Sequence, residues 1–391
     1  MQLIKKAMIV TDGKIYENTD VLVDKGRIVK MGQDLPMADA SIYDASGQTL
    51  LPGLIDCHVH IVSDGLANPM TKLGETIPLA TLRAARNVKR SLNMGITTVR
   101  SLGGFEGVEV AVRKGQQEGI IQGAKVLAAN RGLCMTGGHG HFIGREVDGP
   151  DEARKGTREQ FKAGADVLKL FATGGVSTPG VEPGAAQLTY EEMFAAISEA
   201  HKAGRKATAH AQGTEGIKNA ILAGIDSIEH GIFLDEEVIE LMIQKGVYLV
   251  PTLVAPERIN THGEEGGIPT YAVEKSRRVT ESHIRSFQMA KDLGVKIAFG
   301  TDAGTPFNFH GENARELLLM HQYGMAVLDV LRAATAGSAD NLGLGHDRGR
   351  IEAGLAADLL LIDGNVLADL SLLTSHVVAV MQDGVWIKRD N

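Results

Sequence analysis

Residues 50–60, LLPGLIDCHVH, form an apolar run that ends in two histidines separated by a single residue. Side chains alternate between the two faces of an extended strand, so His58 and His60 point the same way. Two imidazole groups on one face, at the end of a buried strand, could bind one metal ion. The alternative is a pair of partly buried histidines that hydrogen-bond to the backbone. The metal interpretation therefore requires further ligands from the rest of the chain.

Beyond this segment, short apolar runs alternate with amphipathic segments of helical length, several of which end just before a glycine. The expected strands are residues 49–56, 96–100, 124–129, 166–171, 206–210, 226–229, 247–250 and 295–300. The expected helices are residues 79–94, 151–163, 190–203, 216–223, 235–244 and 273–293. Strands that alternate with helices through short turns form a parallel sheet. Eight such units predict an α/β fold with a closed (β/α)8 TIM barrel, and a doubly wound open sheet is the alternative.

The two ends of the chain have a different pattern, in which apolar and polar residues alternate in short pieces. This pattern predicts small antiparallel strands, with Asp383-Gly384 as a hairpin turn near the C-terminus. Neither end is large enough to bury a core alone, so we expect them to meet. The expected domains are a small β-sandwich from residues 1–52 and 350–391, and a barrel from residues 53–349.

Composition and charge narrow the class of protein. The formal net charge is −8 and the sequence pI is about 5.9, without a basic patch, so neither nucleic acid nor a membrane is expected as a partner. The N-terminus lacks the apolar core of a signal peptide, and the two cysteines do not form a disulfide framework. We expect a cytoplasmic enzyme that acts on a small molecule. Homo-oligomers are also expected for so large a barrel, although no sequence feature fixes the number of subunits.

Polar residues recur at the ends of the expected strands, where active sites of such barrels lie. They are His58, His60, Lys169, His210, His230 and Asp302. Only 13 of 391 residues are histidine, so chance is a poor explanation for this placement. Each residue alone has a simpler interpretation: a histidine at the rim, an aspartate that caps a helix, or a lysine paired with Asp166 or Glu182. Taken together, the six residues predict a metal site.

Motifs along nearly the whole chain resemble those of one enzyme family. They are PGLIDCHVH (52–60), GITTVR (95–100), TGGHG (136–140), Lys169, HAQG (210–213), SIEHG (227–231), GTD (300–302) and GLAADL (354–359). The ordered set resembles the amidohydrolase superfamily of metal-dependent hydrolases. It is most similar to the branch with imidazolonepropionase-related proteins and Xaa-Pro dipeptidases, which are prolidase-like.

The resemblance implies a binuclear metal centre. His58 and His60 would bind the more buried ion with Asp302, whereas His210 and His230 would bind the second ion. Lys169 would be carboxylated by CO2, and the resulting carbamate would bridge the two ions. Zn²⁺ suits imidazole and carboxylate ligands, and Mn²⁺ or Co²⁺ could occupy the same set. A free lysine ammonium would be repelled by two dications, which agrees with a carbamate at this position.

The same resemblance implies the chemistry. A water between two metals loses a proton near neutral pH, and the bridging hydroxide would attack a polarised carbonyl. Asp302 would accept the proton as general base and deliver it to the leaving amine as general acid.

Residues outside the ligand set are expected to contact the substrate. His139 and His141 lie in a glycine-rich stretch that could orient a carbonyl or carboxylate, or could be a surface loop. Gly175 could offer its backbone N–H to a substrate carboxylate. Gln212 stands where many dipeptidase-like members carry an aromatic residue. Tyr248 could contact the substrate or fill the barrel.

The leading hypothesis is a binuclear hydrolase that cleaves an amide bond in a dipeptide or an N-acyl amino acid. A cyclic-amide hydrolase or a deaminase of the same superfamily is the second, but mononuclear relatives of that kind generally lack the lysine of the fourth strand. A non-catalytic barrel is the third, and such a protein would usually have lost a ligand position.

Overall fold

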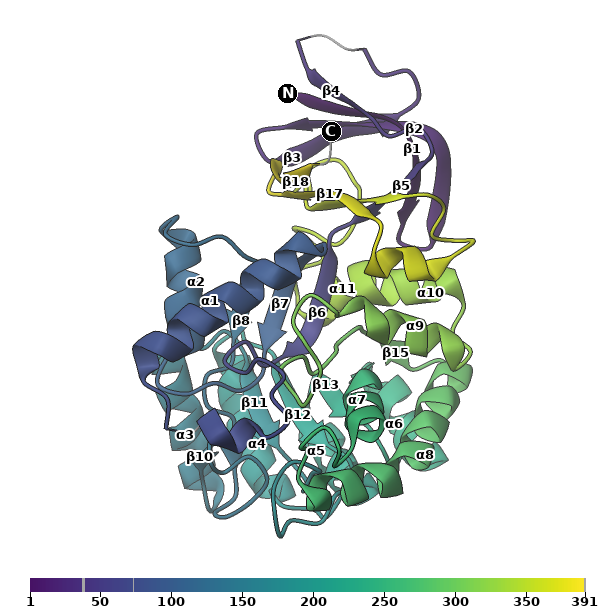
Figure 1. Cartoon of the computed structure of the whole chain (residues 1–391). Coiled ribbons are helices and arrows are strands. Elements are labelled where there is room, and N and C mark those ends of the chain that lie inside the picture. The colour runs from purple at the N-terminus through teal and green to yellow at the C-terminus, as the bar shows by residue number, and fades with distance from the viewer. Residues whose placement is uncertain (37–38, 73, 390–391) are drawn as a thin grey trace.

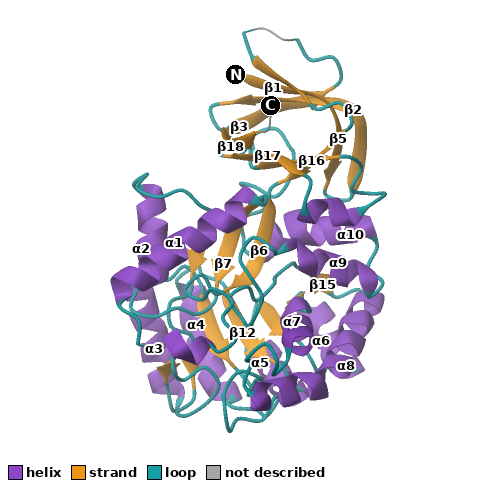
Figure 2. Cartoon of the chain, viewed as in Figure 1, coloured by secondary structure: helices purple, strands orange, loops and turns teal. Residues whose placement is uncertain are grey.

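The computed structural model describes residues 1–36, 39–72 and 74–389, so parts of the expected domain ranges, residues 37–38, 73 and 390–391, lie outside the described residues. A β-sheet unit that contains both chain ends lies above a larger α/β unit (Figure 1). Helices surround the strands of the α/β unit, whereas the upper unit consists mainly of strands and loops (Figure 2). Both ends of the chain therefore contribute to one β unit, as expected from the sequence.

Eight strands form the upper unit as a single hydrogen-bonded sheet. They are β1 (Gln2–Thr11), β2 (Lys14–Asp24), β3 (Arg27–Gly32), β4 (Ser41–Asp44), β5 (Gln48–Pro52), β16 (Leu359–Asp363), β17 (Val377–Gln382) and β18 (Val385–Arg389). The order is β18-β17-β16-β5-β1-β2-β3, and β4 also pairs with β1. The expectation of antiparallel strands is wrong for β1, which pairs in parallel with β4 and β5. Alternation of apolar residues determines which face is buried, but it does not indicate the direction of the neighbouring strand.

The strands of the α/β unit run parallel to their neighbours in two sheets. One sheet contains β6 (Leu54–Val59), β7 (Ile96–Ser101) and β8 (Lys125–Ala128). The other has the order β10-β9-β11-β12-β13-β14-β15, with β9 (Leu133–Cys134), β10 (Arg145–Glu146), β11 (Leu168–Phe171), β12 (Ala207–Ala211), β13 (Ser227–His230), β14 (Tyr248–Val250) and β15 (Lys296–Ile297). Because the strands are parallel, their carboxyl ends lie on the same side of the unit.

Backbone hydrogen bonds join the two sheets at both edges. Asp166 N donates to Ala128 O at 2.7 Å, which links the start of β11 to the end of β8. On the other side, Cys57 N donates to Phe299 O at 2.8 Å, which links β6 to the segment after β15. Backbone hydrogen bonds therefore connect the three-stranded sheet to the larger sheet on both of its sides.

The expected strand at residues 49–56 is in fact two strands in different sheets. β5 pairs with β16, and β6 pairs with β7. The chain crosses from one unit to the other at Gly53, where a Cβ atom would lie 2.3 Å from Thr97 Cγ2. Both strands are fully buried at this point, so the apolar run continues across the boundary and the sequence pattern does not reveal it.

Six helices correspond to the expected ones. They are α1 (Ile77–Asn93), α3 (Pro150–Lys162), α4 (Tyr190–Lys202), α5 (Thr214–Leu222), α6 (Glu236–Lys245) and α8 (Thr270–Leu293). Gly294 ends α8 in the left-handed region, with φ of 90°, as the glycine pattern predicted. The helices that were not predicted are α2 (Val108–Gln117), α7 (Val254–His262), α9 (Ala314–Gln322), α10 (Val327–Arg332) and α11 (Ser338–Asn341). Among the described residues, no helix is both long and apolar enough to cross a membrane.

Candidate active site

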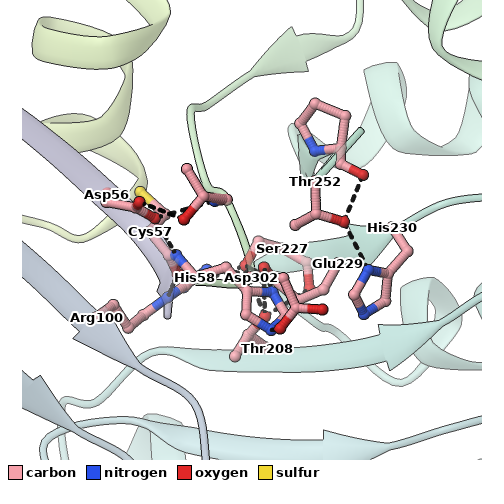
Figure 3. A network of polar contacts seen from close by, with 12 residues as sticks. Asp56, Cys57, His58, Arg100, Thr208, Ser227, Glu229, His230, Thr252 and Asp302 are labelled. Carbon is pink, nitrogen blue, oxygen red and sulfur yellow. Dashed lines mark hydrogen bonds and ion pairs between the residues drawn. The ribbon is translucent and has the colours of Figure 1, made fainter. Parts of the chain in front are cut away.

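One cavity at the carboxyl ends of the strands contains all six predicted ligand residues. They are His58, His60, Lys169, His210, His230 and Asp302. The side chains come from β6, β11, β12, β13 and the segment after β15. Five of the six residues are buried, and His60 is partly exposed to the cavity. Residues that are far apart in the sequence thus meet, because the parallel strands have their carboxyl ends on the same side of the unit. Figure 3 shows His58, His230 and Asp302 facing one another.

Each of the four histidines uses one ring nitrogen to contact a group that is not among the six predicted ligand residues. The pairs are His58 Nδ1 with Glu229 Oε2 (2.7 Å), His60 Nδ1 with Gly103 O (3.3 Å), His210 Nε2 with Gly174 O (3.3 Å) and His230 Nδ1 with Thr252 Oγ1 (2.7 Å). An imidazole that donates through one nitrogen has its other nitrogen available as a ligand atom. In its neutral form, each of these histidines therefore keeps its other ring nitrogen as a potential metal ligand.

Asp302 lies at the middle of the cluster. Its Oδ1 is 3.3 Å from His58 Nε2 and 3.1 Å from His60 Nε2. Burial opposes ionisation of Asp302, but the charge of His58 and the hydrogen bond from His60 hold the pKa of its carboxyl below the ordinary value. Ligand atoms of His58, His230 and Asp302 all lie within 4.8 Å of one another, an arrangement that could hold a metal ion. The donor set, two imidazoles and a carboxylate, is one that binds divalent transition metals.

Two of these residues have unusual backbone conformations. His230 has φ of 74° and Asp302 has φ of 59°, in the left-handed region that residues other than glycine rarely adopt. In a regular strand, Glu229 and His230 would point to opposite faces. With the left-handed conformation at His230, both Glu229 and His230 face His58. Glu229 Oε2 lies 2.7 Å from His58 Nδ1, and the ring centroids of His230 and His58 are 5.1 Å apart. Strain of this kind is concentrated at functional sites.

Lys169 is buried without a polar partner. It is 2% exposed, and in the described part of the chain its Nζ forms neither a hydrogen bond nor an ion pair. The two acidic partners considered from the sequence pair elsewhere: Asp166 with Arg113, and Glu182 with Arg278. Burial lowers the pKa of Lys169 to about 8. More of this amine is therefore neutral and nucleophilic near pH 8 than of an exposed lysine, whose pKa is about 10.4.

A buried ion pair below the site was not predicted from the sequence. Glu229 Oε1 accepts a hydrogen bond from Arg100 Nη2 at 2.7 Å, and neither side chain is more than 1% exposed. Burial opposes ionisation of Glu229, but the Arg100 charge and the His58 hydrogen bond lower its pKa to about 2. A signal was present, because Arg100 and Glu229 both lie in short strands of the α/β unit, and a charged residue that is buried there needs a partner.

Two of the predicted substrate contacts line the cavity. His139 lies beside His210, with 4.3 Å between ring centroids, and its Nδ1 contacts Thr178 Oγ1 at 2.8 Å. Gln212 is 4% exposed, and its Oε1 has no hydrogen-bond partner among the described residues. Gly175 lies directly behind these rings, since a Cβ there would be 2.6 Å from His139 Nε2 and 2.8 Å from His210 Nε2.

The other two predicted substrate contacts lie away from the cavity lining. Tyr248 begins β14 at the amino end of the strand, and it packs against the core cluster that contains Ile55 and Cys57. The structure therefore does not bring Tyr248 into the cavity, which lies at the carboxyl ends of the strands. His141 is exposed, and its Nδ1 contacts Gly138 O at 3.0 Å. Its loop reaches the site through the residues on either side, Gly140 and Phe142.

The rest of the cavity wall is largely apolar. Its apolar side chains include Met70, Phe142, Ile143, Val176, Ile232, Ile259 and Val279. Apart from Lys169 and Asp302, the described residues that line the cavity include no lysine, arginine, aspartate or glutamate. The polar centre therefore lies at the bottom of an apolar chamber, the usual composition of a pocket for a small molecule.

Comparison with known proteins agrees with this fold. Residues 49–387 match the Amidohydrolase family, and the chain belongs to that family. Ochratoxinase of Aspergillus niger is 31% identical over 92% of this chain and 80% of its own length. Imidazolonepropionase of Paracoccus denitrificans is 28% identical over 93% of this chain and 94% of its own length.

A solved structure extends the comparison to three dimensions. A prolidase in complex with N-methylphosphonate-L-proline has a TM-score of 0.93 and 29% identity over the full length of both chains. The resemblance to the imidazolonepropionase-related and prolidase-like branch is confirmed by these relatives. The protein is accordingly an amidohydrolase, an enzyme of the class that hydrolyses C–N bonds.

Proposed function

We propose that the chain is a binuclear metal-dependent hydrolase that cleaves the amide bond of a dipeptide or an N-acyl amino acid. Residues 53–349 would form a closed (β/α)8 barrel, and residues 1–52 with 350–391 a β-sandwich. The observation that carries the proposal is Lys169, a buried amine without a polar partner in the described structure, in the same cavity as four histidines that each have an available nitrogen.

In this proposal, the residues of the cavity would hold two divalent ions. His58, His60 and Asp302 would hold one ion, and His210 with His230 the other. Lys169 would bridge them after its neutral amine has attacked CO2 and lost a proton, which produces an anionic carbamate. The lowered pKa of Lys169, about 8, supplies the neutral amine that this reaction needs. Zn²⁺, Mn²⁺ and Co²⁺ all accept imidazole and carboxylate ligands.

Bound ions would supply an activated water and polarise the carbonyl of the scissile amide. Asp302 would accept the proton of that water at Oδ1 and then donate it to the leaving amine, as general base and general acid. His139 and Gln212 line the chamber and would orient the substrate by hydrogen bonds. The apolar side chains of the wall would bind the apolar part of the substrate and exclude bulk water.

The prolidase comparison supports a dipeptide or an N-acyl amino acid as the class of substrate, because that structure was solved with a proline phosphonate. The name of the Aspergillus niger relative, ochratoxinase, indicates that a relative of this chain acts on ochratoxin. Cleavage of a cyclic amide is the second candidate, supported by the similarity to imidazolonepropionase. The lysine in β11 favours the first candidate, since mononuclear relatives generally lack it.

The test combines metal analysis with a substrate screen. Protein prepared with Zn²⁺, Mn²⁺ or Co²⁺ in bicarbonate buffer is analysed for metal content, and each form is screened against dipeptides, N-acyl amino acids and cyclic amides. We expect two ions per chain, hydrolysis of an open-chain amide, and loss of activity with a chelator. One ion per chain with turnover of a cyclic amide would support the second candidate. Absence of turnover in every form would contradict both candidates and support a non-catalytic role.

A further inference from the structure

A buried network of polar side chains connects neighbouring strands beside the candidate metal centre. Figure 3 shows Arg100, Glu229 and His58 in this network. Arg100 of β7 donates to Glu229 of β13 at 2.7 Å, and the other oxygen of Glu229 is 2.7 Å from Nδ1 of His58 in β6. The opposite nitrogen of His58, Nε2, faces Asp302 at 3.3 Å. The imidazole of His58 is thus held between a carboxylate inside the fold and a carboxylate in the cavity.

The carboxylate of Glu229 is fixed by more than these two contacts. Ser227 Oγ lies 3.0 Å from Glu229 Oε1, and the Thr208 hydroxyl also donates to this oxygen. Arg100 is fixed in turn, because its Nε donates to Cys57 O at 2.6 Å. Both side chains are therefore held by several hydrogen bonds, and rotation of the Glu229 carboxylate would break several of them at once.

We propose that Glu229, held in place by Arg100, is a positioning residue that fixes the tautomer and the ring orientation of His58. Glu229 is anionic and accepts only, so the hydrogen on the His58 ring must be on Nδ1, and the lone pair of Nε2 faces the cavity. An anionic partner also makes the imidazole a better electron-pair donor. This inference rests on the proposed function, since His58 acts here as a metal ligand.

A purely structural role for the pair makes a different prediction from a positioning role. A buried ion pair can often be replaced by apolar side chains of similar volume without loss of stability, whereas removal of one partner leaves an unpaired buried charge. The informative variant is therefore the double replacement Arg100→Met/Glu229→Met. A structural pair predicts unchanged metal affinity in the folded double variant, and a positioning pair predicts weakened affinity.

The experiment measures the dissociation constant for Zn²⁺ by competition with a chromophoric chelator, on full-length protein stripped of metal. Circular dichroism and thermal unfolding of the metal-free forms check the fold. We expect the Arg100→Met/Glu229→Met protein to bind the first ion about 10–100-fold more weakly than the unmodified protein. The matched control is Arg348→Met/Asp358→Met, which removes another buried arginine–carboxylate pair, at 9% and 3% side-chain exposure, outside the lining of the cavity. Its affinity for Zn²⁺ should remain unchanged.

A conservative variant keeps the inference testable if the double replacement does not fold. Glu229→Gln keeps an oxygen that can accept from His58 Nδ1 but lacks the negative charge, so it should weaken Zn²⁺ binding by a smaller factor than the double variant. Affinity equal to that of the unmodified chain in the folded variants would overturn the positioning role and leave the proposed function intact. Absence of Zn²⁺ binding by the unmodified chain would overturn both.

Discussion

Two regions of the α/β unit each contain a buried lysine, and the two lysines differ in their hydrogen-bond partners. Lys275 lies on α8, in the wall of the unit, and is 8% exposed. Its Nζ donates to Thr178 O at 2.7 Å and also to Val181 O. Lys169 lies in β11 at the centre, is 2% exposed, and has no polar partner in the described part of the chain. Burial lowers the pKa of both groups.

The comparison shows that burial of a lysine does not by itself indicate function. Lys275 connects α8 to the loop that carries Ser177 and Glu182, and this loop has further contacts with the helix from Tyr271 and Arg278. Its ammonium satisfies carbonyl groups that would otherwise be unpaired. The amine of Lys169 forms no hydrogen bond in the described structure. The Phe171 ring, whose centroid is 5.5 Å from Nζ, and the charges of Glu229 and Asp302 offset part of the cost of burying it. We therefore expect replacement of Lys169 to affect mainly activity, and replacement of Lys275 to affect mainly stability.

The largest expected effect is on activity. Lys169→Met should reduce kcat/KM for amide hydrolysis by about a thousandfold or more, because the bridging anion would be lost. Lys275→Met should retain kcat/KM within about tenfold of the unmodified protein, because Lys275 does not line the cavity. Steady-state assays with the best substrate of the screen, on protein of verified fold, measure both. Similar losses in the two variants would remove the distinction between the two regions.

The next effect tests whether Lys169 and Asp302 act as one unit. Asp302→Asn alone should lower kcat by about 10²–10⁴-fold, since it removes the general base. The double variant Lys169→Met/Asp302→Asn should be little worse than either single variant, as residues that act together give strongly non-additive losses. The same assays on three variants provide the measurement. Multiplicative losses would mean that the two residues act independently.

A smaller effect concerns stability in the Lys275 region. Lys275→Met leaves the carbonyl groups of Thr178 and Val181 without their donor, so the free energy of unfolding should fall by about 1–3 kcal/mol. Urea denaturation followed by circular dichroism measures this change. Arg278→Met is the matched control, because it removes an exposed ion pair to Glu182 and should cost less than about 1 kcal/mol. Equal losses would show that the two buried hydrogen bonds contribute little.

The smallest effect is the pH dependence of stability from Lys169 itself. Burial lowers its pKa from 10.5 to about 8, so between these values the unfolded chain binds more protons than the folded chain. The free energy of unfolding therefore rises with pH through this window, and the penalty is fully present below pH 8. For each pH unit between these two values, Lys169→Met should remove a rise of roughly 1 kcal/mol in the free energy of unfolding, because one pKa unit corresponds to about 1.4 kcal/mol. Denaturation of both metal-free proteins in CO2-free buffers measures the difference, and parallel pH curves would contradict the assigned shift.

Much of the site could be predicted from the sequence, because parallel strands place their carboxyl ends together. His58, His60, His210, His230 and Asp302 could be selected as strand-end residues without coordinates, and they do share one cavity. The motif order also sufficed to identify the family. The spacing of residues within a strand and the alternation of strands with helices are local properties, so they are visible in a single sequence.

Other features depend on groups that are far apart in the chain. The sequence alone left open whether Lys169 pairs with Asp166, which in the structure contacts Arg113 instead. Tyr248 could not be assigned to an end of its strand, because strand boundaries within an apolar run are poorly determined by pattern. The parallel pairing of β1 with β5 could not be predicted from the sequence either, because the direction of a strand relative to its neighbour depends on the path of the intervening chain.

The sequence by itself determined the repeating α/β architecture, the joining of the two chain ends, the family and the histidine–lysine–aspartate set. Only the tertiary structure decided which nitrogen of each histidine is available, that Lys169 lacks a polar partner, and that Arg100 and Glu229 meet under His58. The physical reason is that residue type and periodicity determine which side chains are buried and on which face. Hydrogen-bond partners depend on distances across strands that are separated by more than 100 residues, such as the 129 residues between Arg100 and Glu229.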